Sequence, residues 1–205
     1  MEHEEEPVRG LPGRLPPGEH ILWQGCPDWR LFARTALPLR ALAVYFALLI
    51  GWSLAAGSPY GAAATFVAGL ALFGLMLLFA WGVGRSTVYT LTDKRIVLRI
   101  GIALAKCVNL PLALIAAADL RRHGDRGGDI LLTLNEGERV GYALLWPHVR
   151  PWRLARPQPM LRALPDAEAL AQLLSRAAAE YLSERDGNGE AVARRRPAAA
   201  MEAAA

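Results

Sequence analysis

The sequence contains little cysteine: only Cys26 and Cys107 occur among its 205 residues. The two lie far apart, and neither belongs to a CxxC motif or a histidine-rich segment. A disulfide framework and a zinc site are therefore excluded as organising features. We expect two buried or partly exposed thiols instead.

Motifs for catalysis are also absent. The four histidines are scattered, and there is no HExxH motif, nucleophile elbow or metal-spaced cluster of carboxylates. The glycine-rich segment 121–129 lacks the spacing of a phosphate-binding loop, so we expect a hairpin tip there. The net charge of +4 does not indicate a general nucleic-acid binder. We therefore predict a protein that is not an enzyme, binds no nucleic acid and has no cofactor or metal site.

Charge is missing from one long segment. Positions 41–84, 44 residues in all, include no Asp, Glu, Lys, Arg or His. A single membrane span needs about 20 apolar residues, so this segment is long enough for two. The sequence GSPYG at 57–61 marks the turn between them. We predict a transmembrane helical hairpin over 37–84; a buried hairpin in a soluble core is the alternative.

The charges on either side of this hairpin predict its orientation. Basic residues precede the first span and follow the second, whereas the turn has no charge; they are Arg30, Arg34, Arg40, Arg85, Lys94 and Arg95. By the positive-inside rule, both termini are cytoplasmic. The N-terminal MEHEEEP is acidic, the reverse of the basic start of a signal peptide.

Small residues recur at four-residue steps in both spans. They are Ala43, Ala47, Gly51 and Ala55 in the first span, and Gly61, Thr65 and Gly69 in the second. This spacing places them on one helix face and permits close backbone approach. The two helices can use these faces to pack on each other. The other interpretation is a surface for a further membrane helix, from a partner or from a second copy in a homodimer.

After Arg85 the pattern changes to short alternating strands separated by turns. The predicted strands are STVYTLT, RIVLRIG, AKCVNLPL, LIAAADLRRH, ILLTLNEG and ERVGYALLW, the last with Val140, Tyr142, Leu144 and Trp146 on one side. Such close spacing is typical of an antiparallel sheet. An apolar stripe at helical spacing predicts one closing helix over 166–183, with Asp166 as its N-cap. The fold class is therefore α+β, a two-helix transmembrane hairpin plus an antiparallel β-domain.

The remaining segments complete the predicted domain organisation. We expect a disordered acidic N-terminus over 1–14 and a cytoplasmic segment over 15–36 that contributes an early strand or docking segment to the β-domain. The β-domain occupies 85–184. The Ala-rich tail over 185–205 is expected to be disordered.

Four segments resemble parts of known protein families. YTLTDKRIVLRIG followed by NLPLALIAAADL resembles the bacterial pleckstrin-homology-like (PH-like) domain, whose strands carry a Y-x-L-T-[DN]-x-R pattern. LPPGEHILWQGCPDW resembles the opening of its membrane-bound members. With LLWPHVRPWRLARPQPMLRALPD, these segments resemble the photosynthetic-complex assembly proteins of purple bacteria. The resemblance implies an assembly factor of the bacterial inner (intracytoplasmic) membrane. Its partners would be photosynthetic reaction-centre subunits, with the light-harvesting complex as a secondary client, or other assembly factors.

The segment between Glu138 and Asp166 is the candidate surface for binding a partner or lipid. It contains five arginines and no acid, interleaved with tryptophans and prolines. Arginine with tryptophan is enriched in binding hot spots and also suits anionic lipid. The candidate residues are Trp146, His148, Arg150, Trp152, Arg153 and Arg156. A solvated connector whose tryptophans enter the domain's own core is the structural alternative.

Two functions fit these features. The first is a non-catalytic assembly factor for the photosynthetic reaction centre, as the resemblance implies. The second is a general membrane-anchored PH-like scaffold or lipid-surface-binding protein. A third interpretation, an enzyme acting on lipid or pigment precursors, is supported by no catalytic motif in the sequence.

Overall fold

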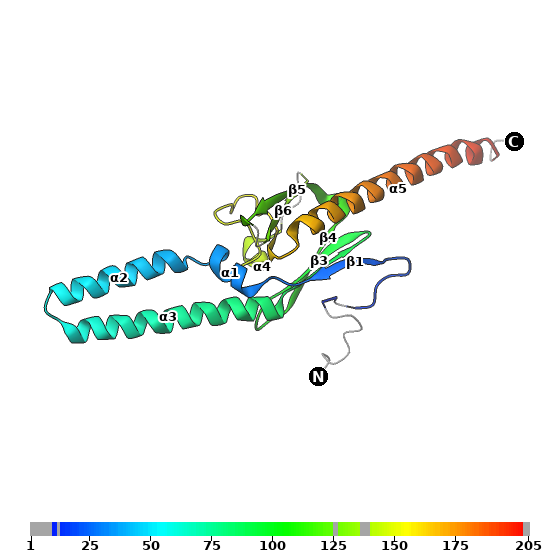
Figure 1. The fold of residues 1–205 in the computed structure, drawn as a ribbon. Coiled ribbons are helices and arrows are strands. Elements are labelled where there is room, and N and C mark those ends of the chain that lie inside the picture. Colours follow the sequence, from blue (N-terminus) through cyan, green and yellow to red (C-terminus); the bar gives the residue numbers. More distant parts are fainter. Residues whose placement is uncertain (1–9, 12, 125–126, 136–139, 203–205) are drawn as a thin grey trace.

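The computed structural model describes residues 10–11, 13–124, 127–135 and 140–202. Figure 1 shows three parts in a row: a long helical hairpin, a β-domain at its base, and a C-terminal helix that projects away from the hairpin. The expected acidic N-terminus and the tip of the loop after β5 lie largely outside the described residues.

The β-domain contains two antiparallel sheets, as the alternating pattern predicted. The first has the order β1-β2-β3-β4, with β1 Ile21–Gly25, β2 Val88–Thr92, β3 Arg95–Ile100 and β4 Lys106–Pro111. The second has the order β5-β6-β7, with β5 Ile115–Arg122, β6 Gly128–Leu134 and β7 Met160–Leu164. A single 3-10 turn, η1 Leu112–Leu114, joins them. The predicted α+β class with antiparallel strands is confirmed.

Strand β1 lies before the hairpin in sequence and β2 after it, yet the two pair directly. Gln24 is opposite Thr90, and Gly25 is opposite Tyr89. The hairpin is therefore an insertion between two neighbouring strands of one sheet. This fixes both ends of the hairpin to the β-domain.

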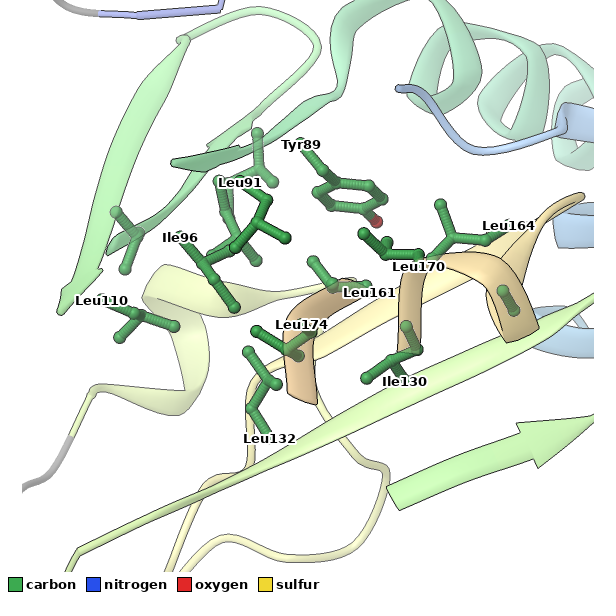
Figure 2. Packing of buried hydrophobic residues seen from close by; sticks show 14 of the residues in the cluster. Tyr89, Leu91, Ile96, Leu110, Ile130, Leu132, Leu161, Leu164, Leu170 and Leu174 are labelled. Carbon is green, nitrogen blue, oxygen red and sulfur yellow. The ribbon is translucent and has the colours of Figure 1, made fainter. Parts of the chain in front are cut away.

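One apolar core joins the two sheets to the start of α5 (Ala167–Glu202). Figure 2 shows buried side chains from the first sheet, the second sheet and α5 converging; they are Tyr89, Leu91, Ile96, Ile130, Leu132, Leu161, Leu170 and Leu174. The alternation in β3 and the helical spacing in α5 place these side chains on inward faces. The first turns of α5 therefore close the domain.

Two predictions about the later segments need correction. The segment ERVGYALLW is not a strand: from Tyr142 to Leu145 it forms the short helix α4, and residues 136–139 lie outside the described part. The last strand of the second sheet is β7, which was not predicted from the sequence because the surrounding segment is rich in Pro and Arg. Helix α5 also continues to Glu202, where we expected a disordered tail. Alanine has the highest helix propensity, and the 191–202 segment is rich in it.

The hairpin consists of α2 (Leu39–Ala55) and α3 (Pro59–Ser86). The Ser58 hydroxyl caps α3 by accepting a hydrogen bond from the Gly61 N–H at 3.3 Å, and Pro59 occupies its first turn. Helix α3 has 28 residues and a mean hydropathy of 2.3 in its most apolar window, of which only 11% is buried. It is the single described helix that is long and apolar enough by itself to cross a membrane.

Helix α2 does not meet that length by itself. Its 17 residues span about 25 Å, less than the roughly 30 Å hydrocarbon core. It reaches the required length only together with α1 (Trp29–Ala36), from which it is bent by 61°. The structure therefore contains a helical hairpin in which one helix is a candidate span by itself, and a second span exists only if the bent pair α1–α2 counts as one.

Helix α1 connects the hairpin to the domain. The Asp28 carboxylate caps it by accepting hydrogen bonds from the N–H groups of Arg30 and Leu31, at 2.7 and 3.0 Å. Its buried residues Leu31, Phe32 and Ala33 form a second apolar cluster with Ala80 and Val83 of α3 and Ala163 of β7. The base of α3 is therefore packed against the β-domain and not joined to it by a free linker.

The small residues of the two hairpin helices have different surroundings. Gly69 is buried where the ring of Phe46 from α2 crosses α3, and Gly61 lies against the hydroxyls of Ser53 and Ser58. Thr65 is partly buried beside them. In contrast, the first-span residues Ala43, Ala47, Gly51 and Ala55 are exposed. Ala43 and Ala47 nevertheless line a groove between the two helices together with Gly69, so both interpretations stay open for the first span.

Replacing Gly69 with leucine is expected to separate the two helices. A Cβ atom at Gly69 would lie 2.9 Å from the Phe46 ring, closer than real contacts allow. Overpacking of this kind costs about 1–3 kcal/mol. We expect a lower Tm for Gly69→Leu in detergent. Gly74→Leu on the same helix, where a Cβ atom meets nothing within 4 Å, is the control and should melt like the parent. Equal Tm values for the two variants would contradict this packing.

Candidate functional site

The Y-x-L-T-D-x-R motif anchors the N-terminal segment to the sheet. The Thr92 hydroxyl accepts hydrogen bonds from the N–H groups of Lys94 and Arg95, which forms the turn between β2 and β3. The same hydroxyl donates to the Glu19 carboxylate at 2.8 Å. The Asp93 carboxylate accepts from the N–H of His20 at 2.9 Å. The motif residues therefore bind the segment that enters β1.

Glu19 and Arg95 form the ion pair of this group. The Arg95 guanidinium donates two hydrogen bonds to the Glu19 carboxylate, from Nε at 2.8 Å and from a terminal nitrogen at 2.9 Å. The Glu19 side chain is 2% exposed, whereas that of Arg95 is 28% exposed. Such a two-point contact fixes orientation as well as distance. The ion pair joins positions 76 residues apart, across the whole hairpin.

A second polar group lies inside the domain, next to α1. His148 is fully buried, with Nδ1 2.6 Å from the Tyr89 hydroxyl and Nε2 3.1 Å from the Thr87 hydroxyl. The Tyr89 oxygen also accepts a hydrogen bond from the N–H of Arg162. The Tyr89 proton therefore points to Nδ1, which makes Nε2 the protonated nitrogen that donates to Thr87.

Burial keeps the His148 and Tyr89 side chains neutral. Burial, reinforced by the positive charge of Arg162, lowers the pKa of His148 to about 3. Burial raises the pKa of Tyr89 well above its ordinary value. Neither side chain changes protonation near neutral pH, so the group holds β2 and the 146–149 segment together and is not suited to acid–base chemistry.

Asp129 links the second sheet to the N-terminal segment. One carboxylate oxygen accepts from the N–H of Ala163 at 2.8 Å, and the other lies 2.8 Å from Nε2 of His123. The Ala163 carbonyl in turn accepts from the N–H of Asp28, directly before α1. Ala163 has a φ of 53°, a strained value for alanine that these two hydrogen bonds maintain.

The structure places the predicted surface residues in two environments. Five of them line one exposed loop or lie at its entry: Trp146, Arg150, Trp152, Arg153 and Arg156. His148 is buried, so its assignment to the surface was wrong; its imidazole satisfies two buried hydroxyls. The alternative that both tryptophans enter the core is also wrong, since Trp146 is 57% and Trp152 95% exposed.

The loop is held at its base and free at its tip. Val149 and Pro159 form a β-bridge, and the Arg150 N–H donates to the Gln158 carbonyl at 3.0 Å. The Arg150 guanidinium also donates to the Gln158 side chain at 3.0 Å. Within residues 151–156 every side chain is exposed. The segment thus presents Trp152, Arg153 and Arg156 on a defined stem.

This loop begins next to the hairpin. The Trp146 ring packs on Phe79 of α3, with 5.4 Å between ring centroids. In the connection between β3 and β4, Ile102 lies against Gly82 of α3, and its side chain is half exposed. The exposed aromatic and basic side chains are therefore adjacent to the end of the apolar helix. We define residues 146–156 as the loop surface.

Sequence reasoning found the loop surface but missed the buried polar groups. The motif named Thr92 and Arg95 without revealing Glu19 as their partner. That partner lies on the far side of the hairpin, so no local spacing indicates it. Arg162 was counted only as one of five arginines. Cys26 and Cys107 are both exposed and form no disulfide.

Comparison with known proteins agrees with this architecture. The bacterial PH domain family matches residues 35–178, a range that includes the hairpin and most of the β-domain. A Rhodobacter capsulatus protein, named "Uncharacterized 23.7 kDa protein in puhA 5'region", is 37% identical over 189 residues, covering 87% of this chain and 88% of that protein. No solved structure matches significantly. The two antiparallel sheets, the closing helix and the matched range together show that this chain belongs to the bacterial PH domain family.

Proposed function

We propose that this chain is a non-catalytic assembly factor for the photosynthetic reaction centre, of the PuhB type. The observation that carries the proposal is the relative in Rhodobacter capsulatus, which its name places beside the photosynthesis gene puhA. The similarity extends over nearly the whole of both chains. The relative therefore supports a photosynthetic role for the entire architecture and not for an isolated module.

The hairpin would anchor the protein in the inner membrane. Helix α3 is exposed along an apolar surface that water would not favour. Helix α2 has no charge after Arg40 and packs along α3, so it would cross with α3 if its N-terminal end is completed by residues 36–38. The basic residues flanking the hairpin support two spans with both termini in the cytoplasm.

The loop surface would contact the client. Its exposed tryptophan and arginines have the composition of a binding hot spot, and its stem holds them beside the membrane anchor. A client subunit in the same membrane would meet this surface at a high effective concentration, so that individually weak contacts suffice. This arrangement needs no catalytic group.

Deletion of the gene tests the proposal. We expect a deletion strain to lose at least half of its reaction-centre absorbance while growing normally by respiration. Complementation with the intact chain should restore the absorbance. Complementation with Arg150→Ala, Arg153→Ala and Arg156→Ala combined should restore it poorly, because the loop surface loses its charge.

The outcomes separate the two functions. Unchanged absorbance in the deletion strain would contradict the assembly role and favour a general membrane-anchored PH-like scaffold. Full complementation by the triple variant would leave the assembly role intact but move the client contact away from the loop surface. A matched triple variant at Arg14, Arg176 and Arg185, which are exposed elsewhere on the chain, controls for loss of charge alone.

A further inference from the structure

A cavity lies where the hairpin joins the domain. Its volume is about 460 Å³, within the range of small-molecule sites. Its lining comes from the α1–α2 junction, residues 35–38, and from the loop surface, of which Trp146, Pro147, Val149, Pro151 and Trp152 take part. Arg162 of β7 and Tyr142 of α4 also line it. The cavity is therefore apolar and aromatic, with one cationic residue.

Arg162 lacks a counter-ion in this cavity. It forms no ion pair with any described residue, and its Nε is buried without a hydrogen-bond partner. The Asp129 carboxylate attracts it but already accepts a hydrogen bond from the Ala163 N–H and contacts His123. A guanidinium has five donors, and leaving even one of them buried without a partner is costly. The residue is prepared to receive an anion.

The neighbouring groups do not supply that anion. Tyr89 and His148 are neutral, and Tyr89 receives only the backbone N–H of Arg162. The Asp129 carboxylate is the strongest charge that acts on Arg162, and Arg121, on β5, adds a weaker positive charge. An anion in the cavity would therefore be a second partner for the Arg162 guanidinium beside Asp129.

We propose that this cavity binds the phosphate of one anionic phospholipid headgroup, with Arg162 as its ion partner. The inference rests on the membrane anchoring proposed above. Residues 36–38 would complete the α2 span and also line the cavity, so the cavity would lie where the hydrocarbon region meets the lipid phosphates. The aromatic rings of Trp146 and Trp152 suit the same boundary.

The geometry favours lipid over a protein carboxylate. The cavity opens beside the first residues of an apolar helix, and its walls are mostly Leu, Val, Pro and Trp side chains. These surfaces suit the glycerol and upper acyl region of a lipid, whereas an acidic peptide would bring polar backbone that the walls cannot satisfy. Guanidinium binds phosphate through two parallel hydrogen bonds.

The test measures lipid bound to the purified full chain in detergent. Native mass spectrometry with added phosphatidylglycerol or phosphatidylcholine should show one phosphatidylglycerol per chain, bound at least tenfold more tightly than phosphatidylcholine. Arg162→Gln should weaken this binding at least tenfold. Arg156→Gln, the same charge change on the exposed loop tip, should change it less than twofold.

A second variant keeps the test valid if Arg162→Gln does not fold. Thr35→Trp adds a large ring at an exposed position of the cavity wall and leaves Arg162 in place; it should also reduce phosphatidylglycerol binding. Equal binding of the two lipids, or undiminished binding by both variants, would overturn the proposal. Saturation by millimolar inorganic phosphate would contradict a lipid source, and preferential binding of an acidic peptide would contradict phosphate. Lipid binding is read without photosynthesis, so its failure is distinct from failure of the assembly role.

Discussion

Replacing Glu19 with alanine is expected to lower the free energy of unfolding by about 3 kcal/mol, the lower end for breaking a buried ion pair. The substitution leaves the Arg95 guanidinium and the Thr92 hydroxyl without the carboxylate they share. Arg95 retains partial access to water, which limits the cost. Because the pair fastens β1 to the β2–β3 turn, the N-terminal segment should loosen first.

Chemical denaturation in detergent measures this effect. Glu168→Ala is the matched control, because Glu168 forms a similarly short ion pair with Arg122 at the surface, where both side chains are more than half exposed. Exposed pairs contribute about 0–1 kcal/mol. The double variant Glu19→Ala, Arg95→Ala should be less destabilised than the sum of its single variants, since it leaves no unpaired charge. A loss for Glu19→Ala no larger than that for Glu168→Ala would contradict the anchoring role.

Acidification is expected to destabilise the protein through His148. The folded state takes up a proton at His148 only near pH 3, whereas an unfolded histidine does so near its ordinary pKa of 6.5. As the pH falls below 6.5, the unfolded state therefore binds more protons than the folded state. Stability is fully present above pH 6.5 and decreases by about 1.4 kcal/mol per pH unit until the pH approaches 3.

The variant His148→Gln isolates this contribution. It should be less stable than the parent at pH 7, because the Tyr89 hydroxyl loses its imidazole acceptor, and the difference should shrink between pH 6 and pH 4. Thr87→Val removes a hydrogen-bond partner of the imidazole but keeps the titrating group, so it should retain the pH dependence of the parent. A difference between His148→Gln and the parent that is constant with pH would refute a buried, neutral His148.

The sequence predicted the parts of the fold that have local signals. The period-two pattern of β2 and β3, the helical stripe of α5 and the uncharged hairpin segment each identify their element without knowledge of its partners. The family motif indicated the PH-like class for the same reason. The structural role of the motif could not be predicted, because Thr92 and Arg95 bind Glu19, which lies before the hairpin in the chain.

The errors arose where tertiary contacts override local pattern. Residues 140–146 alternate like a strand, yet Tyr142–Leu145 form a helical turn that inserts Leu145 into the core. His148 lies between two exposed arginine- and tryptophan-containing stretches, and only the folded chain brings Tyr89 and Thr87 to its ring. No sequence pattern indicates that Nε of Arg162 lacks a hydrogen-bond partner, because this depends on the Asp129 carboxylate bonding to Ala163 and His123 instead.

The most direct test of the assembly role is pulse labelling of reaction-centre subunits in the deletion strain. After a shift from respiratory to photosynthetic conditions, we expect the subunits to be synthesised at the parental rate but incorporated into pigment-containing complexes at less than half of it. Restoring the intact chain should restore incorporation. Parental rates of both synthesis and incorporation without the chain would contradict the account.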